Sequence, residues 1–177
     1  MNALRVSCAG RLAFVVAAMA ALAGSGLALA QQKGATAKEL LGEWNLVSIE
    51  NEKGEKSRSF GENPRGLFIF GPNGRYALQI FRPDLPKFAS NNRLTGTPEE
   101  NMAVVQGTLA HFGTYKVDEK AGSFTIKPEG SSYPNWTGVE QPARTFEISG
   151  DNLKIVNPLP STGSSVSYLM FKRIKSR

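Results

Sequence analysis

The stretch GLFIFGPNGRYALQIFR, residues 66–82, joins two apolar runs through a turn. Residues 66–70 and 75–82 are rich in the aromatic and aliphatic side chains that favour β-strands. Between them, residues 71–74 read Gly-Pro-Asn-Gly, which places glycine where a tight turn needs a positive φ. The stretch therefore predicts a β-hairpin.

The same alternation of short apolar runs and turns continues along the chain. Residues 118–122 and 149–152 supply two more hairpin turns. Consecutive hairpins form an antiparallel meander, and closing the meander into a barrel removes its exposed edges. We predict an all-β fold, a closed eight-stranded antiparallel up-and-down barrel with a cavity for one small ligand. The candidate strands are residues 43–50, 66–70, 75–82, 109–117, 123–128, 144–149, 153–156 and 166–174.

One short helix is predicted within this β background. Thr97 is a candidate N-cap, Pro98 suits the first helical position, and Glu100 completes a capping box with the threonine. These signals predict a helix over residues 98–106.

The helix belongs to a longer segment that is a candidate lid, residues 82–106. Met102 and Val105 could form an apolar stripe with Leu109, so we expect the helix to lie over one mouth or side of the barrel. Ahead of it, the prolines within residues 82–90 exclude a regular strand and favour a crossing loop.

The first thirty residues have the pattern of a cleaved signal peptide. Arg5 and Arg11 give a positive start, residues 12–23 form an uncharged apolar run, and Ala28-Leu29-Ala30 fits the cleavage rule. The run is shorter than the roughly 20 residues of a membrane-spanning helix, so we expect no stable membrane span, with an uncleaved anchor as the alternative. We therefore expect the protein to be exported to the periplasm. Residues 31–38 are expected to be a flexible leader, and residues 39–177 the barrel domain.

Composition excludes several kinds of site. Cleavage would remove Cys8, the only cysteine, and would lower the formal net charge from +6 to +4. With one histidine and no remaining thiol, we expect no metal site and no cofactor, and the phosphate-binding and nucleophile-elbow motifs are absent from the sequence. Because basic residues are scattered among acids, we expect no nucleic-acid partner.

Several segments together resemble the bacterial lipocalin-like domain family, a group of calycin-type barrels. The resemblance covers nearly the whole chain after the leader, and it implies an antiparallel barrel that binds a small molecule, although related folds include a few cyclases and isomerases. In such barrels a Gly-x-Trp opens the sheet and a late arginine packs across the ring, which gives Trp44 and Arg173 structural roles. The segments are residues 41–46, 82–83 with 88–90, 97–100, 112–118, and 134–138 followed by Gln141.

Five residues are candidates for ligand binding. His111 and Tyr115 share one face of a predicted strand, and Tyr76 shares another face with Arg82, a mixed lining that could bind an anionic or carbonyl-bearing amphipath. Trp136 could stack on a ligand at the barrel mouth or plug the end of the core. No catalytic residue is assigned.

The sequence thus predicts an exported lipocalin-like protein that binds a small apolar or amphipathic molecule. Two alternatives stay open. One is a cofactor-free isomerase or cyclase in which His111, Tyr115 and Arg82 are the polar groups of the pocket. The other is a structural or partner-binding barrel with a filled interior.

Overall fold

The structure, a computed structural model, describes residues 35–57, 59–163 and 166–175. The predicted signal peptide and the first residues of the leader, 31–34, lie outside the described residues. Among the described residues, no helix has the length and apolar character needed to cross a bilayer.

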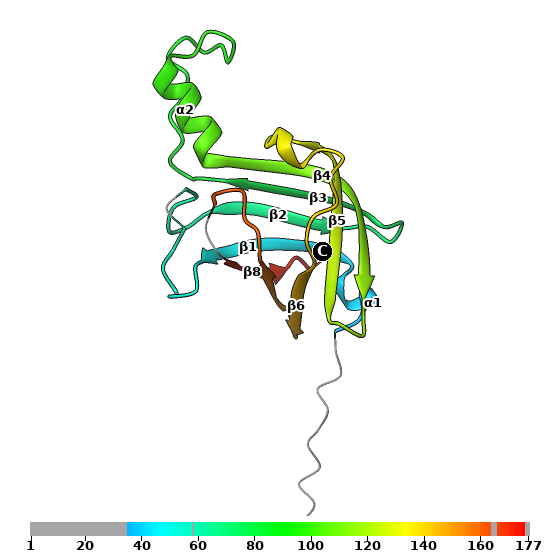
Figure 1. Ribbon diagram of the computed structural model, residues 1–177. Coiled ribbons are helices and arrows are strands. Elements are labelled where there is room, and N and C mark those ends of the chain that lie inside the picture. Colours follow the sequence, from blue (N-terminus) through cyan, green and yellow to red (C-terminus); the bar gives the residue numbers. More distant parts are fainter. Residues whose placement is uncertain (1–34, 58, 164–165, 176–177) are drawn as a thin grey trace, which may run out of the picture. The chain divides into compact units, whose positions relative to one another are not determined.

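The described chain forms the predicted closed barrel. Its strands pair in chain order, each antiparallel to the next, and β8 pairs with β1 to complete the circle (Figure 1). The fold prediction is therefore confirmed, with strand limits close to the predicted ones. The strands are β1 (Gly42–Glu50), β2 (Arg65–Phe70), β3 (Arg75–Phe81), β4 (Thr108–Asp118), β5 (Ser123–Ser131), β6 (Arg144–Ser149), β7 (Asn152–Asn157) and β8 (Ser167–Arg173).

Tight turns define one end of the barrel, which we call the closed end. The β2–β3, β4–β5 and β6–β7 turns lie there, and Gly74, Gly122 and Gly150 each adopt a positive φ. The connections β1–β2, β3–β4 and β7–β8, together with the residues that follow β5, lie at the opposite end, which we call the open end. The long connections are therefore gathered at one end of the barrel.

The closed end is sealed by Trp44 and Arg173. Trp44 is fully buried, and its indole N–H donates to the carbonyl of Leu40 at 2.8 Å. The Arg173 guanidinium lies 4.0 Å from the centre of the Trp44 ring and donates to the carbonyls of Leu41 and Glu39. The structure thus brings the two framing residues together across the β1–β8 seam.

A short helix, α1 (Ala37–Leu40), leads into β1. Thr36 caps it in a box with Glu39. Residues 36–38, which fall in the expected leader, form the cap and first turn of this helix. The capping box satisfies the N–H groups of Thr36 and Glu39, and Leu40 is buried.

The half of the barrel next to the closed end is packed with aromatic rings. Phe68 stacks on Phe70 with ring centres 4.0 Å apart, and both contact Phe124 edge to face. Phe146 and Phe171 extend this cluster. Side chains therefore fill the barrel interior at this end.

The predicted helix is present as α2 (Pro98–Gly107), with the expected Thr97–Glu100 capping box. The prediction of its position is wrong, because α2 projects away from the strands beyond the start of β4 (Figure 1). Met102 is 56% exposed and Val105 is 74% exposed, while Leu109 is buried within β4. Two apolar side chains give too little surface to hold the helix against the barrel.

Candidate functional site

A cavity of about 570 Å³ lies at the open end of the barrel. Its size is within the range of small-molecule sites, roughly 300–1,000 Å³. The β1–β2 and β7–β8 connections border it, whereas no residue of the candidate lid, 82–106, lines it. The candidate lid thus does not line this cavity, although its residues Arg82, Val105 and Gln106 border an adjoining hollow. The interior is not filled at this end. The lining residues are Ile49, Glu50, Asn51, Glu55, Lys56, Ser57, Ser59, Phe60, Ile80, Leu109, Trp136, Asn157, Pro160, Ser161, Thr162, Val166, Ser167 and Leu169.

The inner wall of this cavity is apolar because strand alternation turns these side chains inward. Ile80, Leu109 and Leu169 are buried residues of β3, β4 and β8. Phe60 reaches the cavity from the β1–β2 connection and is also buried. An apolar ligand body would be covered by this wall.

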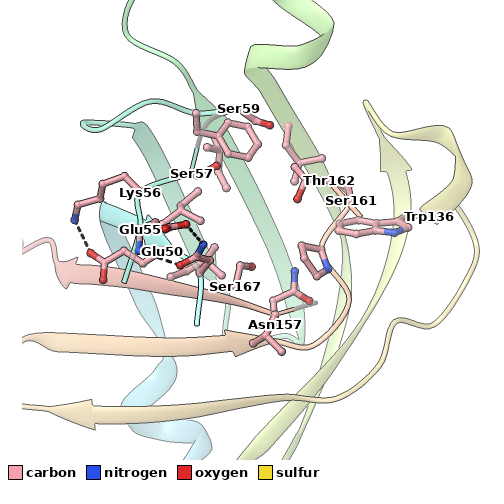
Figure 2. Close-up of a pocket in the computed structure, with 18 residues that line it drawn as sticks. Glu50, Glu55, Lys56, Ser57, Ser59, Trp136, Asn157, Ser161, Thr162 and Ser167 are labelled. Carbon is pink, nitrogen blue, oxygen red and sulfur yellow. Dashed lines mark hydrogen bonds and ion pairs between the residues drawn. The ribbon is translucent and has the colours of Figure 1, made fainter. Parts of the chain in front are cut away.

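Polar side chains lie mainly around the rim. Figure 2 shows the Trp136 ring on one side of the cavity and the Lys56–Glu50 ion pair on the other. The hydrogen bond from Lys56 lowers the pKa of Glu50, so this carboxyl is ionised at neutral pH. Deeper, Asn157 and Ser167 add an amide and a hydroxyl at the ends of β7 and β8.

A second, smaller cavity of about 40 Å³ lies deeper in the barrel. It shares Ile80, Leu109, Trp136, Asn157 and Leu169 with the large cavity, so the two adjoin. Its remaining lining residues are Phe68, Leu78, His111, Ile126, Arg144 and Ile155.

Three of the five predicted ligand-binding residues meet beside the small cavity. The Tyr76 hydroxyl lies 2.9 Å from Nδ1 of His111, within hydrogen-bond distance. The His111 ring contacts Trp136 edge to face, with centres 5.5 Å apart. Burial lowers the pKa of His111 to about 3 and raises that of Tyr76 well above its ordinary value. Both side chains are therefore neutral at pH 7.

The other two predicted residues lie elsewhere. Tyr115 donates to the carbonyl of Gly71 in the β2–β3 turn, at the closed end. Arg82 pairs with Asp84 through two hydrogen bonds. It borders a second hollow beside α2, which adjoins the large cavity through Ser59, Phe60, Leu109, Ser161 and Thr162. Strand alternation predicts the face of a residue but not its distance along the barrel axis, which explains the place of Tyr115. Arg82 lies beyond the end of β3, where strand alternation no longer sets its direction.

Arg144 is the main residue that the sequence analysis missed. It is only 5% exposed, at the start of β6, where it shares the inward face with Phe146. Its guanidinium lies 5.8 Å from the centre of the Trp136 ring. The alternation of Arg144, Phe146 and Ile148 was a readable signal for an inward arginine. Asn157 had the same signal, because it alternates with Leu153 and Ile155 in β7. Phe60 and the β7–β8 connection had none, because barrel closure alone places them at the cavity.

The arrangement suits recognition of one small molecule with an apolar body. The wall supplies apolar surface, and a few polar groups are fixed at the base and the rim. Among the residues that the structure describes, no group of three His, Cys, Asp or Glu side chains could hold a metal ion.

Barrel and cavity together define a lipocalin-like architecture, and the sequence comparison agrees. A family model described as a lipocalin-like domain matches residues 41–174, so the chain belongs to that family. The resemblance noted from the sequence motifs is thereby confirmed.

A curated relative is the 4'-hydroxy-3'-methoxypropiophenone carrier protein of Aspergillus oryzae. The two sequences are 32% identical over 107 residues, which cover 55% of this chain and 96% of the relative. The chain is thus similar to a protein named as a carrier of a small aromatic molecule.

Proposed function

We propose that this protein binds one small apolar or amphipathic molecule in the cavity at the open end of its barrel and acts as a carrier or sequestering protein for it. The observation that carries the proposal is the cavity of about 570 Å³, with its apolar wall and few fixed polar groups. The carrier name of the fungal relative supports the same function, and its aromatic ketone is a reasonable first candidate for a ligand.

The test uses N-phenyl-1-naphthylamine, a neutral fluorescent probe, in a titration of the purified protein. We expect saturable binding at one site per chain and displacement of the probe by 4'-hydroxy-3'-methoxypropiophenone. Ser167→Trp places a large ring in the cavity and should abolish probe binding. Lys172→Trp, on the exposed face of the same strand, is the matched control and should bind the probe normally.

The outcomes separate binding from surface adsorption. A wild-type protein that gives no saturation, or a Ser167→Trp variant that is folded and binds as tightly as Lys172→Trp, would contradict the proposal. Circular dichroism and a melting curve establish that both variants are folded.

A second candidate function, a cofactor-free isomerase or cyclase, is favoured by the Tyr76–His111 contact beside the cavity. Proton-transfer catalysis works best with groups whose pKa lies near the working pH. Burial moves the pKa of His111 and that of Tyr76 away from neutrality in opposite directions. We therefore favour binding, and conversion of a bound ligand that is lost in His111→Ala with affinity intact would reverse this choice.

A further inference from the structure

Arg144 is a buried cation that pairs with no carboxylate of the described residues. None of the ion pairs among the described residues includes it. A guanidinium carries five N–H donors, and a single hydrogen bond is made here, from Nη1 to the carbonyl of Pro142 at 3.4 Å. Most of its donor capacity is therefore unused by the described protein.

Its neighbours compensate the charge only weakly. The Trp136 ring offers a π-face at 5.8 Å, while Tyr76 and His111 are neutral. Burial lowers the pKa of Arg144 to about 10, so the side chain remains charged at neutral pH. Burying an unpaired charge lowers the stability of the folded protein. A bound anion that pairs with Arg144 would offset this loss.

Arg144 borders open space inside the barrel, because it lines the small cavity. No fully enclosed side-chain nitrogen or oxygen among the described residues lacks a partner, so the guanidinium nitrogens without one are those that reach open space. Arg144 lines the cavity of about 40 Å³, which adjoins the large one through five shared residues. A compact head group at this position would touch Arg144 while its apolar body lay in the large cavity.

We propose that Arg144 binds the carboxylate of an amphipathic ligand whose apolar body fills the large cavity. A planar carboxylate matches the two parallel N–H donors of a guanidinium and fits a small space better than a tetrahedral phosphate or sulfonate. This inference rests on the proposed function and adds the chemical class of the ligand. It also transfers to Arg144 the anion-binding role that the sequence suggested for Arg82.

The test compares two probes of nearly the same shape, 2-naphthoate and 2-acetylnaphthalene, by isothermal titration at pH 7.5. The naphthoate has a negatively charged oxygen at the position where the acetyl compound has a methyl group. Because a hydrogen bond to a charged acceptor is stronger than one to a neutral acceptor, the wild type should bind the naphthoate at least about ten-fold more tightly. Arg144→Met should lose this preference, and Arg144→Lys should keep part of it. Arg75→Met, which removes an exposed arginine of the outer surface, should retain the full preference.

Each outcome gives a decision. Equal binding of the two probes by the wild type, or a preference that survives in Arg144→Met, overturns the carboxylate assignment but leaves the binding proposal intact. Absence of binding by both probes overturns both. If Arg144→Met does not fold, two wild-type measurements replace it. They are the preference for 2-naphthoate and the shift of the Arg144 side-chain N–H signals when 2-naphthoate is added. Signals that do not move would contradict direct contact.

Discussion

His111 is held neutral over the pH range in which an exposed histidine gains its proton. Burial is the main cause of its low pKa of about 3, and the nearby charge of Arg144 lowers that pKa further. In the unfolded chain the ordinary value is near 6.5, so below about pH 6 the unfolded state binds a proton that the folded state does not. The contribution of His111 to the free energy of unfolding is therefore complete above pH 6.5 and is lost as the pH falls from 6.5 towards 3.

This linkage predicts a difference between the wild type and His111→Gln. Between pH 6 and pH 4, the free energy of unfolding of the wild type should fall faster, by up to about 1.4 kcal/mol per pH unit. Urea unfolding at several pH values measures both slopes. Parallel curves for the two proteins would show that His111 titrates in the folded state, contrary to its burial.

Arg82, which the sequence analysis proposed for the ligand site, and Arg144, which it missed, illustrate what a single sequence reveals at the residue scale. Alternation indicates that Arg82 and Arg144 could each face the barrel interior. Asp84, two residues further on, holds Arg82 outside, while the inward Phe146 accompanies Arg144. A carboxylate nearby in the sequence can pair with an arginine and keep it out of the barrel, and the sequence shows such a neighbour. The depth of each side chain along the barrel axis depends on how the barrel closes, which the sequence does not show.

At the element scale, the β1–β8 seam depends on Trp44 more than on Arg173. Truncating a buried tryptophan costs about 3–5 kcal/mol, whereas a cation–π contact contributes roughly 0.5–2 kcal/mol. Trp44→Ala should therefore destabilise the protein more than Arg173→Ala does, as measured by denaturant unfolding. Arg75→Ala, which breaks an exposed ion pair, is the control and should cost less than either. An Arg173→Ala loss larger than that of Trp44→Ala would contradict this order.

The strands and the helix limits could be predicted because local chemistry determines them. Glycines with positive φ mark the hairpin turns, and Thr97 with Glu100 marks the start of α2. The place of α2 could not be predicted, because it follows from packing, and a helix with two exposed apolar residues has little to pack. The cavity border also depends on connections that lack a periodic pattern, such as the one that supplies Pro160, Ser161 and Thr162.

At the scale of the whole molecule, the barrel divides into a packed half and a hollow half. Aromatic rings fill the interior near the closed end, and the long connections border the cavity at the open end. This division lets a small domain keep a stable core while leaving room for a ligand.

Export remains a prediction from the first thirty residues of the sequence. If the signal peptide is cleaved after Ala30, the intact mass of the exported protein should correspond to a chain that begins at Gln31. Expression of the full chain in a bacterial host, followed by fractionation and mass spectrometry, provides the measurement. Retention of residues 1–30 in the envelope fraction would contradict the prediction.

The central claim, ligand binding at the open end, is tested most directly by the two tryptophan indole signals of the protein. Trp136 lines both cavities, whereas Trp44 lies at the closed end. A nitrogen–proton spectrum of the labelled protein, titrated with N-phenyl-1-naphthylamine, should show a saturable shift of the Trp136 signal and an unchanged Trp44 signal. A titration in which Trp44 shifts and Trp136 does not, or in which neither signal moves, would contradict the account.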